Sequence, residues 1–360
     1  MTVLSLAVRD FRNIASAELA FSPGLNLFTG DNGAGKTSVL EALYFLGRAQ
    51  SFRTAQPAQA IRSGADFLLV TGQLAEPDGG TVAVGVERSR AATRVRLAGH
   101  PLSGLGELVA RFPFQVLTPD SHELLDGGPG PRRRYLDWGV FHVEPNFLPV
   151  WRRFGRALRQ RNAALRSHAS LPELTLWDRE LAATAVILDQ QRATYIADLS
   201  PLIARYVAQF VDVPGLRWAY RRGWPRDMEY VAALQEGLET DRRHGFTRQG
   251  PHRADLTPLI GNRPAQERIS RGQQKLIVTA MVLAQAALYQ ARRGAPCLFL
   301  IDDLASELDP AHRQRVLGHL RDMGAQLFMT AIEDRSISEV GWPASREFHV
   351  EHGRVSEVVY

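Results

Sequence analysis

The stretch that decides the fold reads Gly30-Asp31-Asn32-Gly33-Ala34-Gly35-Lys36-Thr37. It follows the apolar run 25–29 and precedes a helix-like stretch that ends at Leu46. A glycine-rich turn between a strand and a helix lets consecutive backbone N–H groups point at phosphate oxygens, and the helix N-terminus adds its positive dipole end. We expect all eight residues to bind a nucleoside triphosphate, with Lys36 at the β- and γ-phosphates and Thr37 on Mg²⁺. A chance match in a glycine-containing turn is the alternative, which the flanking strand and helix patterns disfavour.

The end of a second apolar run completes the predicted phosphate site. Residues 295–301 form a strand-like stretch that ends in Asp302 and Asp303, where a nucleotide site needs a carboxylate for Mg²⁺. We expect Asp302 to bind the metal and Asp303 to act as the general base that orients the attacking water. Taken alone, the pair could equally be a solvated strand end. ATP and Mg²⁺ are therefore the predicted cofactors, and Lys36, Asp302 and Asp303 are the predicted catalytic residues.

A third motif predicts a second phosphate-binding edge. Residues 269–275 open a long apolar helix that extends to about Ala291. Ser270, Gly272 and Gln273 lie at the predicted helix N-terminus, where the dipole favours an anion. Because the chain has one phosphate loop, a second such edge suggests a nucleotide held between two subunits. A further helical stretch starts at residues 306–310, just beyond Asp303.

These motifs in this order resemble the RecF family of SMC-type ABC ATPases. Further stretches fit the same family along nearly the whole chain: Phe11-Arg12-Asn13, Leu40-Glu41-Ala42, Ser51-Phe52-Arg53, Arg132-Arg133-Arg134 before Leu136-Asp137, and Gly250-Pro251-His252-Arg253. The resemblance implies an α/β fold, a P-loop ABC/SMC-type ATPase head with an inserted helix-rich second lobe. It also implies that Gln115 senses the γ-phosphate.

The resemblance carries expectations about partners and function. It implies an ATP-dependent homodimer in which Ser270 and Gly272 of a second subunit close on the γ-phosphate. It also implies binding to duplex DNA or to a junction of single- and double-stranded DNA. The expected role is recombinational and replication-gap repair, with RecR and RecO helping to place RecA recombinase, and the DNA-damage (SOS) response.

Two departures from the general ABC pattern concern hydrolysis. Asp303 stands where glutamate is usual and is one methylene shorter, and the run 329–331 lacks a histidine that ABC enzymes often carry near the γ-phosphate. General-base assistance is worth roughly 10²- to 10⁴-fold. We therefore expect weak turnover, as in a switch.

The spacing of the motifs predicts an insertion. About 265 residues separate Thr37 from Asp302, far more than a few crossover units need. Residues 1–112 and 293–360 carry strand-like runs and form the predicted ATPase head, whereas residues 113–292 form the predicted helix-rich lobe. The best amphipathic helix in that lobe starts at Leu174, ends at Ser200-Pro201 and extends roughly 37 Å. Ordinary bundle packing is favoured for it over a partner-binding coiled coil.

Arginines concentrate in one part of the insertion. Residues 130–170 contain nine arginines and two acidic residues. On a helix, Arg152, Arg156, Arg159 and Arg166 lie within about 80° of one another, and such a stripe suits phosphate backbones without reading bases. The predicted DNA-binding residues are Arg132, Arg133, Arg152, Arg156 and Arg159. A solvated helix face is the alternative.

Other basic and aromatic residues leave two interpretations open. The run 217–224 could stack bases, although Trp218 and Trp224 fit a core better. Arg12 and Arg53 could approach the nucleotide or form surface salt bridges.

Composition limits the classes of protein that fit. The 360 residues are 45% apolar, which can fill one large or two smaller cores. No apolar run of about 18 residues and no leader-like N-terminus is present, so we expect a cytoplasmic protein with no membrane contact. The single Cys297 allows no internal disulfide. A net charge of +5 fits a polyanionic partner or simply a basic enzyme.

Lysine is rare in this chain. Only Lys36 and Lys275 among 43 basic residues are lysines, which suggests that the compact ammonium is needed at the phosphate loop. The ATPase subunit of an ABC membrane transporter shares the motif order, but the arginine-rich insertion and the missing histidine disfavour it. A non-catalytic scaffold that binds ATP structurally is the other rival.

Overall fold

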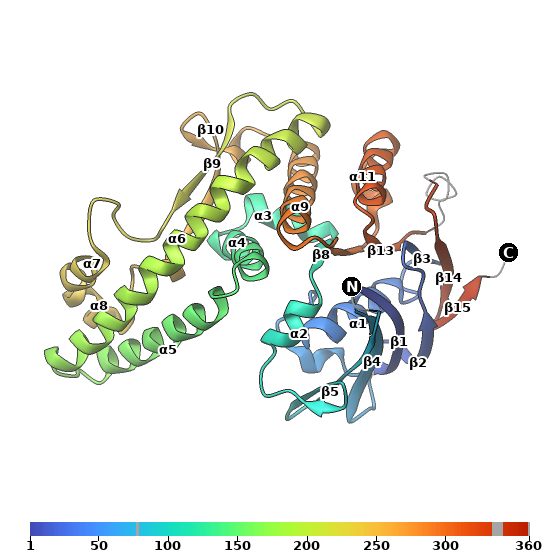
Figure 1. Cartoon of the computed structure of the whole chain (residues 1–360), viewed down its shortest axis with the longest axis horizontal. Helices are drawn as coiled ribbons and strands as arrows, with labels where there is room; N and C mark the ends of the chain where they lie inside the picture. The colour runs from blue at the N-terminus through green and yellow to red at the C-terminus, as the bar shows by residue number, and fades with distance from the viewer. Residues whose placement is uncertain (77–78, 333–340, 359–360) are drawn as a thin grey trace. The chain divides into compact units, whose positions relative to one another are not determined.

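The computed structural model describes residues 1–76, 79–332 and 341–358 of the chain, without the side chains of residues 305 and 306 (Figure 1). The chain divides into two compact units. The sheet unit comprises residues 1–121 and 289–360, and the helical unit comprises residues 122–288. The first boundary lies later than the predicted one, because residues 114–117 pair with a strand of the sheet unit.

The first sheet of the sheet unit is mainly parallel, with the order β15-β14-β3-β13-β12-β8. Only the pair β14 and β15 is antiparallel. The strands are β3 (Leu25–Thr29), β8 (Phe114–Leu117), β12 (Leu298–Ile301), β13 (Gln326–Thr330), β14 (Ser345–Glu351) and β15 (Arg354–Val358). Every residue of β3, β12 and β13 is buried, as expected for parallel strands covered on both faces. Because these three strands are neighbours, the residues after their carboxyl ends share one edge of the sheet.

The second sheet of this unit is antiparallel, with the order β2-β1-β4-β5-β6-β7. Its strands are β1 (Thr2–Phe11), β2 (Ile14–Ala20), β4 (Phe67–Ala75), β5 (Thr81–Ser89), β6 (Thr93–Leu97) and β7 (His100–Pro101). The helix α1 (Lys36–Arg48) contacts strands of both sheets and buries most of its circumference. One hydrophobic core therefore joins the two sheets through α1.

Shorter elements complete the sheet unit. They are η1 (Pro57–Ala60), α2 (Gly106–Arg111), η2 (Pro119–His122), α10 (Leu304–Glu307) and α11 (Pro310–Asp322). Asp309 caps α11, because its side chain accepts hydrogen bonds from the N–H groups of Ala311 at 3.0 Å and His312 at 3.1 Å.

The helical unit consists of helices and a small antiparallel sheet of order β11-β10-β9. Its helices are α3 (Glu123–Asp126), α4 (Pro129–Val143), α5 (Phe147–Arg166), α6 (Leu171–Phe210), α7 (Tyr230–Glu236), α8 (Leu238–His244), η3 (Pro251–Arg253), η4 (Ala265–Glu267) and α9 (Arg271–Arg293), whose last turn belongs to the sheet unit. The strands are β9 (Leu216–Arg221), β10 (Asp255–Ile260) and β11 (Arg263–Pro264). A four-residue connection joins α5 to α6, so the two helices form an antiparallel hairpin (Figure 1).

The helix α6 is longer than the sequence predicts. It continues through Pro201 to Phe210, giving 40 residues and a length of about 60 Å. Proline inside a helix costs about 3 kcal/mol. Beyond it, however, α6 buries Ile203, Tyr206 and Val207, and this packing offsets the lost hydrogen bond. The predicted end at Pro201 was therefore wrong.

The segment Gly250–Arg253 ties several elements of the helical unit together. Arg192 of α6 donates to the carbonyl of Pro251 at 2.8 Å and also pairs with Asp137 of α4. His252 Nε2 lies 3.0 Å from the carbonyl oxygen of Thr247, so this nitrogen carries the proton. Burial lowers the pKa of His252 to about 4, and the charges of neighbouring arginines act in the same direction. His252 is therefore neutral at pH 7.

We expect this histidine to make the helical unit acid-sensitive. Its pKa is about 4 in the folded chain and about 6.5 when unfolded, so its contribution is complete above pH 6.5 and is lost as the pH falls towards 4. The loss is at most ~3 kcal/mol. His252→Gln should flatten the pH dependence of the thermal midpoint between these values, whereas His100→Gln, at an exposed position, should not. Equal curves for the two variants would contradict the assignment.

Candidate nucleotide-binding site

The phosphate loop lies between the end of β3 at Thr29 and the start of α1 at Lys36. Two of its glycines are required by close approach as well as by positive φ. A Cβ at Gly30, where φ is 138°, would lie 2.1 Å from the carbonyl oxygen of Val350. A Cβ at Gly35, where φ is 120°, would lie 2.7 Å from Nδ2 of Asn13. The obstacle is backbone at Gly30 and the Asn13 side chain at Gly35, and at both positions the positive φ disfavours any other residue.

Two turns from opposite ends of the chain hold the loop. The carbonyl oxygen of Ala34 accepts hydrogen bonds from Asn13 Nδ2 at 3.0 Å and from the Gly353 N–H at 2.8 Å. Asn13 lies in the turn between β1 and β2, and Gly353 lies in the turn between β14 and β15. Sequence reasoning did not assign either residue to the site, because nothing local to them indicates this contact.

Lys36 folds back over the loop. It is 8% exposed, and its Nζ donates to the carbonyls of Gly30 at 2.6 Å and Asp31 at 2.9 Å. Burial lowers the pKa of Lys36, while the carboxylates of Asp303, Asp302 and Asp31 act in the opposite direction. A bound anion would favour the charged ammonium further. The loop is thus shaped to receive negative charge.

The carboxylate of Asp302, which directly follows β12, connects the first turn of α1 with the end of β13. Thr37 Oγ1 lies 2.9 and 3.0 Å from its two oxygens, and Thr330 Oγ1 donates to Oδ1 at 2.8 Å. Thr330 Oγ1 also accepts the N–H of Asp303 at 2.8 Å. The structure therefore brings Thr37 and Asp302 together as the sequence predicts. The structure also places Thr330 in this site, a residue to which the sequence analysis gave no role beyond noting that the run 329–331 lacks a histidine.

The donor set at this edge suits Mg²⁺. Hydroxyl and carboxylate oxygens are the hard ligands that Mg²⁺ prefers, at 2.0–2.1 Å in octahedral geometry. Adjacent oxygens of such an octahedron lie about 3 Å apart. The 2.9 Å between Thr37 Oγ1 and Asp302 Oδ1 matches that edge. Among the described residues, no group of three or more His, Cys, Asp or Glu side chains could hold a metal by itself, so water and phosphate oxygens would complete the coordination.

Asp303 has a left-handed backbone, with φ at 50°. Aspartate is among the few non-glycine residues that tolerate this region. Of the three carboxylates that act on Lys36, that of Asp303 acts most strongly. Its N–H donates to Thr330 Oγ1, which also binds Asp302, so the residue lies at the same edge as the phosphate loop. Its role as general base stays a prediction. In the neighbouring motif 306–310, the side chain of Ser306 lies outside the described residues.

Arg12 and Arg53 meet at a buried carboxylate of α1. Glu41 is fully buried, and Arg12 donates to both of its oxygens, at 2.9 and 2.6 Å. Ser51 also donates to Glu41, and Arg53 Nη1 lies 3.5 Å from it. Of the two interpretations of these arginines, the structure shows ion pairing. Three motifs, at residues 11–13, 40–42 and 51–53, thus form one cluster beside the phosphate loop.

Gln115 does not lie at the carboxyl edge of the sheet. It is buried in β8 opposite Phe299 of β12, two residues before the strand ends. The residue of β8 that lies beside the site is Leu117 at the end of the strand, whose carbonyl accepts the Asp302 N–H at 2.8 Å. The expected γ-phosphate role of Gln115 is therefore not supported by its position in this structure.

The predicted second phosphate edge lies in the helical unit, at the start of α9. Ser270 Oγ accepts the N–H of Gln273 at 3.2 Å, and Gln273 Oε1 accepts the N–H of Ser270 at 2.9 Å. This reciprocal pair is a capping box. Ser270, Arg271 and Gly272 are exposed, so the helix N-terminus is open to solvent.

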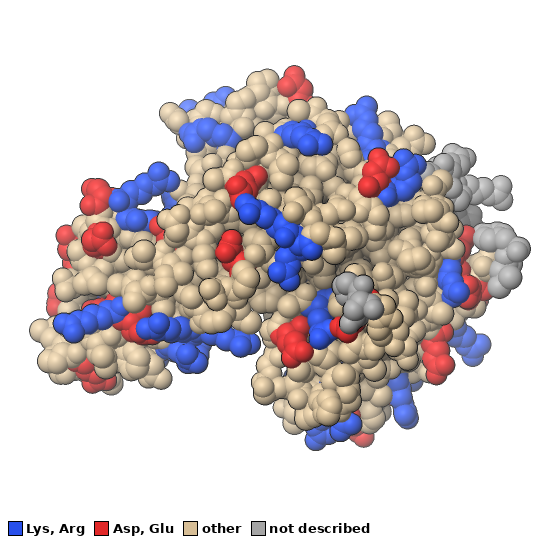
Figure 2. All heavy atoms as spheres, in the orientation of Figure 1, with Lys and Arg blue, Asp and Glu red and all other residues tan. Residues whose placement is uncertain are grey.

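The predicted DNA-binding residues separate into two groups. Arg152, Arg156 and Arg159 are exposed on α5, and together with Arg166 they form what we call the α5 arginine stripe. Figure 2 shows basic side chains along the edge of the molecule that α5 occupies. This part of the prediction is compatible with the structure.

Arg132, by contrast, is 7% exposed and has a structural role. Its Nε and Nη2 bind the carboxylate of Asp255 at 2.7 and 3.1 Å, and its Nη1 binds the carbonyl of Gly127 at 2.7 Å. Arg133 donates to the carbonyl of Ala254 at 2.9 Å, and burial lowers its pKa. Because these donors are already bound within the unit, Arg132 cannot contact DNA in this conformation and Arg133 is poorly placed to do so. Counting local charge could not reveal this pairing.

The aromatic run 217–224 mainly packs inward. Trp224 is buried, its ring lies 4.8 Å from that of Tyr230, and the Arg222 guanidinium lies 4.4 Å above it. Trp218 is partly buried in β9. The core interpretation fits Trp224.

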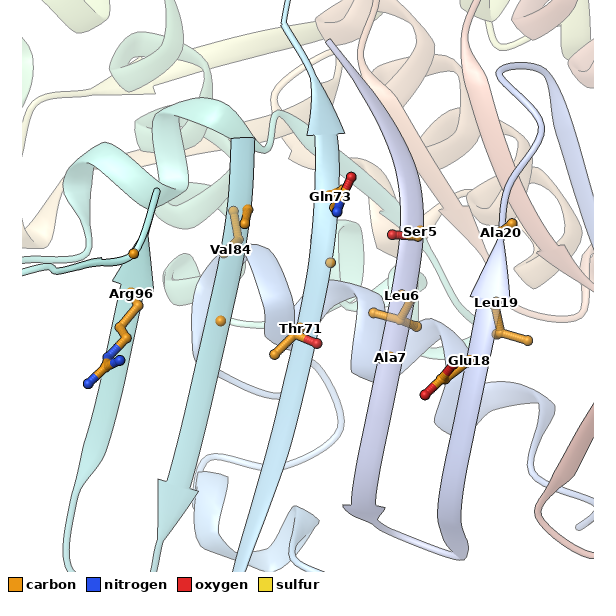
Figure 3. A pocket seen from close by; sticks show the side chains of 14 residues that line it. Ser5, Leu6, Ala7, Glu18, Leu19, Ala20, Thr71, Gln73, Val84 and Arg96 are labelled. Carbon is orange, nitrogen blue, oxygen red and sulfur yellow. The ribbon is translucent and has the colours of Figure 1, made fainter. Parts of the chain in front are cut away.

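A separate hollow of about 700 Å³ lies on the antiparallel sheet (Figure 3). Strands β1, β2, β4, β5 and β6 line it, mostly with small side chains such as Ala7 and Ala83. Glu18 and Arg96 come from strands on its two sides. None of the predicted site residues lines this hollow.

Cys297 is buried, and burial raises the pKa of its thiol, which disfavours the reactive thiolate. Within the described ranges, every helix is too short or too polar to cross a bilayer.

Together, the glycine-rich loop, the strand-end carboxylate and the two sheets around α1 define the head of a P-loop ATPase of the ABC/SMC class. The head of an SMC protein bound to the C-winged helix domain of ScpA superposes with a TM-score of 0.61 at 15% identity, covering 99% of this chain and 97% of that one. A recombination mediator protein RecF bound to ATP superposes with a TM-score of 0.88 at 22% identity, covering 99% and 98%. The predicted fold class is confirmed.

Sequence comparison defines the family. The profile of the RecF/RecN/SMC N-terminal domain matches residues 2–354. The DNA replication and repair protein RecF of Vibrio vulnificus (strain CMCP6) is 39% identical over 358 residues, covering 99% of this chain and all of the relative. RecF of Pseudomonas aeruginosa (strain LESB58) is 41% identical over 364 residues, covering 99% and 98%. The chain belongs to the RecF/RecN/SMC family and, within it, to the RecF proteins, which confirms the resemblance seen in the sequence.

Thr330 offers a test of the Asp302 junction. Thr330→Val keeps the side-chain shape but removes the hydroxyl that donates to Asp302 and accepts from Asp303. We expect the free energy of unfolding of the sheet unit to fall by ~1–3 kcal/mol, because two partly buried polar groups lose a partner. Thr330→Ser keeps the hydroxyl, so its free energy of unfolding should fall less than that of Thr330→Val. Thermal unfolding of both variants checks this, and equal midpoints for Thr330→Val and the parent chain would refute it.

Proposed function

We propose that this protein is an ATP-gated DNA-binding protein of recombinational and replication-gap repair. The observation that carries the proposal is the junction at Asp302, where Thr37 and Thr330 bind one carboxylate beside a buried, loop-bound Lys36. The loop N–H groups and Lys36 would hold the phosphates of ATP, and Thr37 and Asp302 would hold Mg²⁺. The ATP-bound RecF structure with the same fold supports this assignment.

Pairing of two copies is the second part of the proposal. Ser270 Oγ accepts from Gln273, which leaves its own hydroxyl proton available to donate. The N–H groups of Arg271 and Gly272 lie in the exposed first turn of α9, where an anion is favoured. This edge of one copy would bind the γ-phosphate held by the other, giving a twofold dimer with two nucleotides.

A slow switch fits these residues better than a motor. Differential binding of ATP to the paired state is sufficient to shift the balance between monomer and dimer. Asp303 would orient water for hydrolysis, and its short side chain on a left-handed backbone favours slow resetting. Turnover would then release the pair.

DNA would bind the α5 arginine stripe through its phosphates. Arg152, Arg156 and Arg159 present guanidinium groups on one exposed helix face, which suits a phosphate backbone and reads no bases. Arg132 and Arg133 are not included, because Arg132 is bound on all sides within the helical unit and Arg133 is half-buried with Nη1 bound to Ala254.

The relatives support the biological context. One is named a DNA replication and repair protein, and a solved structure is described as a recombination mediator in the RecFOR pathway. We therefore propose RecR and RecO as partners, loading of RecA near gaps, a contribution to the SOS response and a cytoplasmic location. No observation favours a transporter subunit.

Two variants test the gating. Lys36→Met should abolish ATP binding, because it removes the loop cation. Ser270→Arg should leave ATP binding intact and abolish ATP-driven pairing, because it blocks the shared edge. Light scattering and nucleotide titration with and without ATP measure both properties. Normal pairing by Ser270→Arg would count against a shared nucleotide.

Gln273 gives a sharper test of the same edge. Glutamate can replace glutamine in a capping box, so Gln273→Glu should keep the stability of α9 while placing a negative charge beside the γ-phosphate. We expect it to weaken ATP-driven pairing at least about tenfold, corresponding to ~1.4 kcal/mol. Gln273→Ala should lose some stability, about 1 kcal/mol, and pair better than Gln273→Glu. The reverse order of pairing would refute the contact.

Salt dependence tests the stripe. The logarithm of DNA affinity should fall with the logarithm of salt concentration at a slope of about −0.9 per phosphate neutralised. Arg152→Ala should flatten this slope by about one for every DNA sequence, whereas Arg90→Ala, an exposed arginine between β5 and β6, should leave it unchanged. Equal slopes for the two variants would remove α5 from the DNA site.

A further inference from the structure

The helix α6 exposes an apolar stripe that serves neither the nucleotide site nor the α5 arginine stripe. Leu176 is 61% exposed and Ile187 is 43% exposed, and Ala183 between them is also exposed. At about 100° per residue, the three lie within roughly 40° of one another on one face of the helix. Isolated exposed leucines are ordinary, but an aligned series on one rigid helix indicates a contact surface.

A hollow beside Leu176 extends this surface to the neighbouring helix. It has a volume of about 420 Å³ and lies between α5 and α6. Its walls are formed by Arg153, Arg156, Ala157, Leu176, Trp177, Arg179 and Glu180. The lining thus combines apolar and aromatic side chains with charged ones, which we call the rim: three guanidinium groups and the carboxylate of Glu180.

The charge of the rim is only partly compensated. Arg153 forms a two-point ion pair with Glu180, which holds the pKa of that carboxyl below its usual value. Within residues 1–76, 79–332 and 341–358, neither Arg156 nor Arg179 has an acidic group within 4 Å. Arg156 acts on Glu180 only at longer range, through its charge. Two cations without a close acidic partner therefore flank an exposed apolar stripe, and a complementary ligand would carry carboxylates beside apolar side chains.

We propose that this face of the α5–α6 hairpin binds an acidic amphipathic helix of a partner protein. The intervals from Leu176 to Ala183 and from Ala183 to Ile187 are seven and four residues, and the stripe extends about 16 Å, or three helical turns. A helix laid along it would present apolar residues at the matching intervals, with acidic residues reaching Arg156 and Arg179. The surface shares Arg156 with the α5 arginine stripe but is separate from the motifs of the nucleotide site, so this inference does not depend on the proposed ATP gating.

Two other occupants fit the surface less well. Phosphates of DNA would use the arginines but would leave Leu176 and Ile187 facing a charged backbone with no gain. A second copy of the same face would bring its arginines against those of the first, and like charges oppose such pairing. The acidic helix alone uses both the apolar stripe and the rim.

The test uses the full-length protein and a fluorescent, stapled helical peptide of about five turns. Its leucines recur every third or fourth residue and its remaining inward positions are glutamates. A second peptide carries lysine in place of each glutamate. Anisotropy titrations should show that the acidic peptide binds at least about tenfold more tightly than the basic one. Equal binding of the two peptides would overturn the proposal.

Paired variants locate the contact. Leu176→Asp should weaken binding of the acidic peptide about tenfold or more, whereas Leu171→Asp, which is similarly exposed but lies on another face of α6, should change it less than about twofold. Arg179→Glu should weaken binding about fivefold or more, whereas Arg205→Glu, further along the same helix, should not. Equal losses within either pair would overturn the proposal.

Two controls distinguish the other occupants. Binding of a DNA duplex should be unchanged in Leu176→Asp. If this variant instead loses duplex binding and keeps peptide binding, the surface belongs to DNA and the proposal is overturned. Sedimentation without nucleotide should show the same mass for Leu176→Asp and the parent chain. A smaller mass for the variant would show a contact between copies instead. Failure of the peptide to bind leaves the Lys36 and Ser270 experiments unaffected, so the two proposals fail independently.

Discussion

The carboxylate of Asp302 connects parts of the chain that are far apart in sequence. Thr37, at the start of α1, and Thr330, at the end of β13, both place a hydroxyl within 3.0 Å of it. This contact requires β3, β13 and β12 to be neighbours in that order. The phosphate loop after β3 leads to Thr37, β13 ends at Thr330, and Asp302 directly follows β12. The site is therefore a consequence of strand order, and any change in that order would separate its parts.

Burial of α1 gives this edge its rigidity. The helix lies between two sheets, and its charged Glu41 is fully buried yet paired with Arg12 and Ser51. An unpaired carboxylate there would cost several kcal/mol, so the pair fixes the β1–β2 turn against α1. The same turn carries Asn13, which holds Ala34 of the phosphate loop. Positioned donors lose little freedom when a ligand arrives, which favours tight binding of phosphates.

Local patterns predicted the parts of the site that depend on neighbours in sequence. The phosphate loop, the strand before Asp302 and the start of α9 all follow from glycine, apolar and small polar residues within a few positions. Arg132 was misjudged because its partner Asp255 is 123 residues away. Pro201 was misjudged because tertiary burial beyond it outweighs its local cost. Thr330 and Asn13 gave no local signal, since a hydroxyl or amide acquires its role only when another strand or loop is placed beside it.

The surfaces of the α5–α6 hairpin depend on one buried arginine. Arg161 is fully buried and binds Asp178 of α6 and Asp241 of α8, each at 2.6 Å. Arg161 lies nine residues after Arg152, about 180° around the helix. Fixing Arg161 inward therefore fixes the stripe of Arg152 and Arg159 outward. The same ion pair anchors Asp178, which lies two residues after Leu176 on α6. It therefore also sets the rotation of α6 about its own axis, and with it the direction in which Leu176 faces. One buried network thus determines which cations and which apolar side chains of the hairpin are available to ligands.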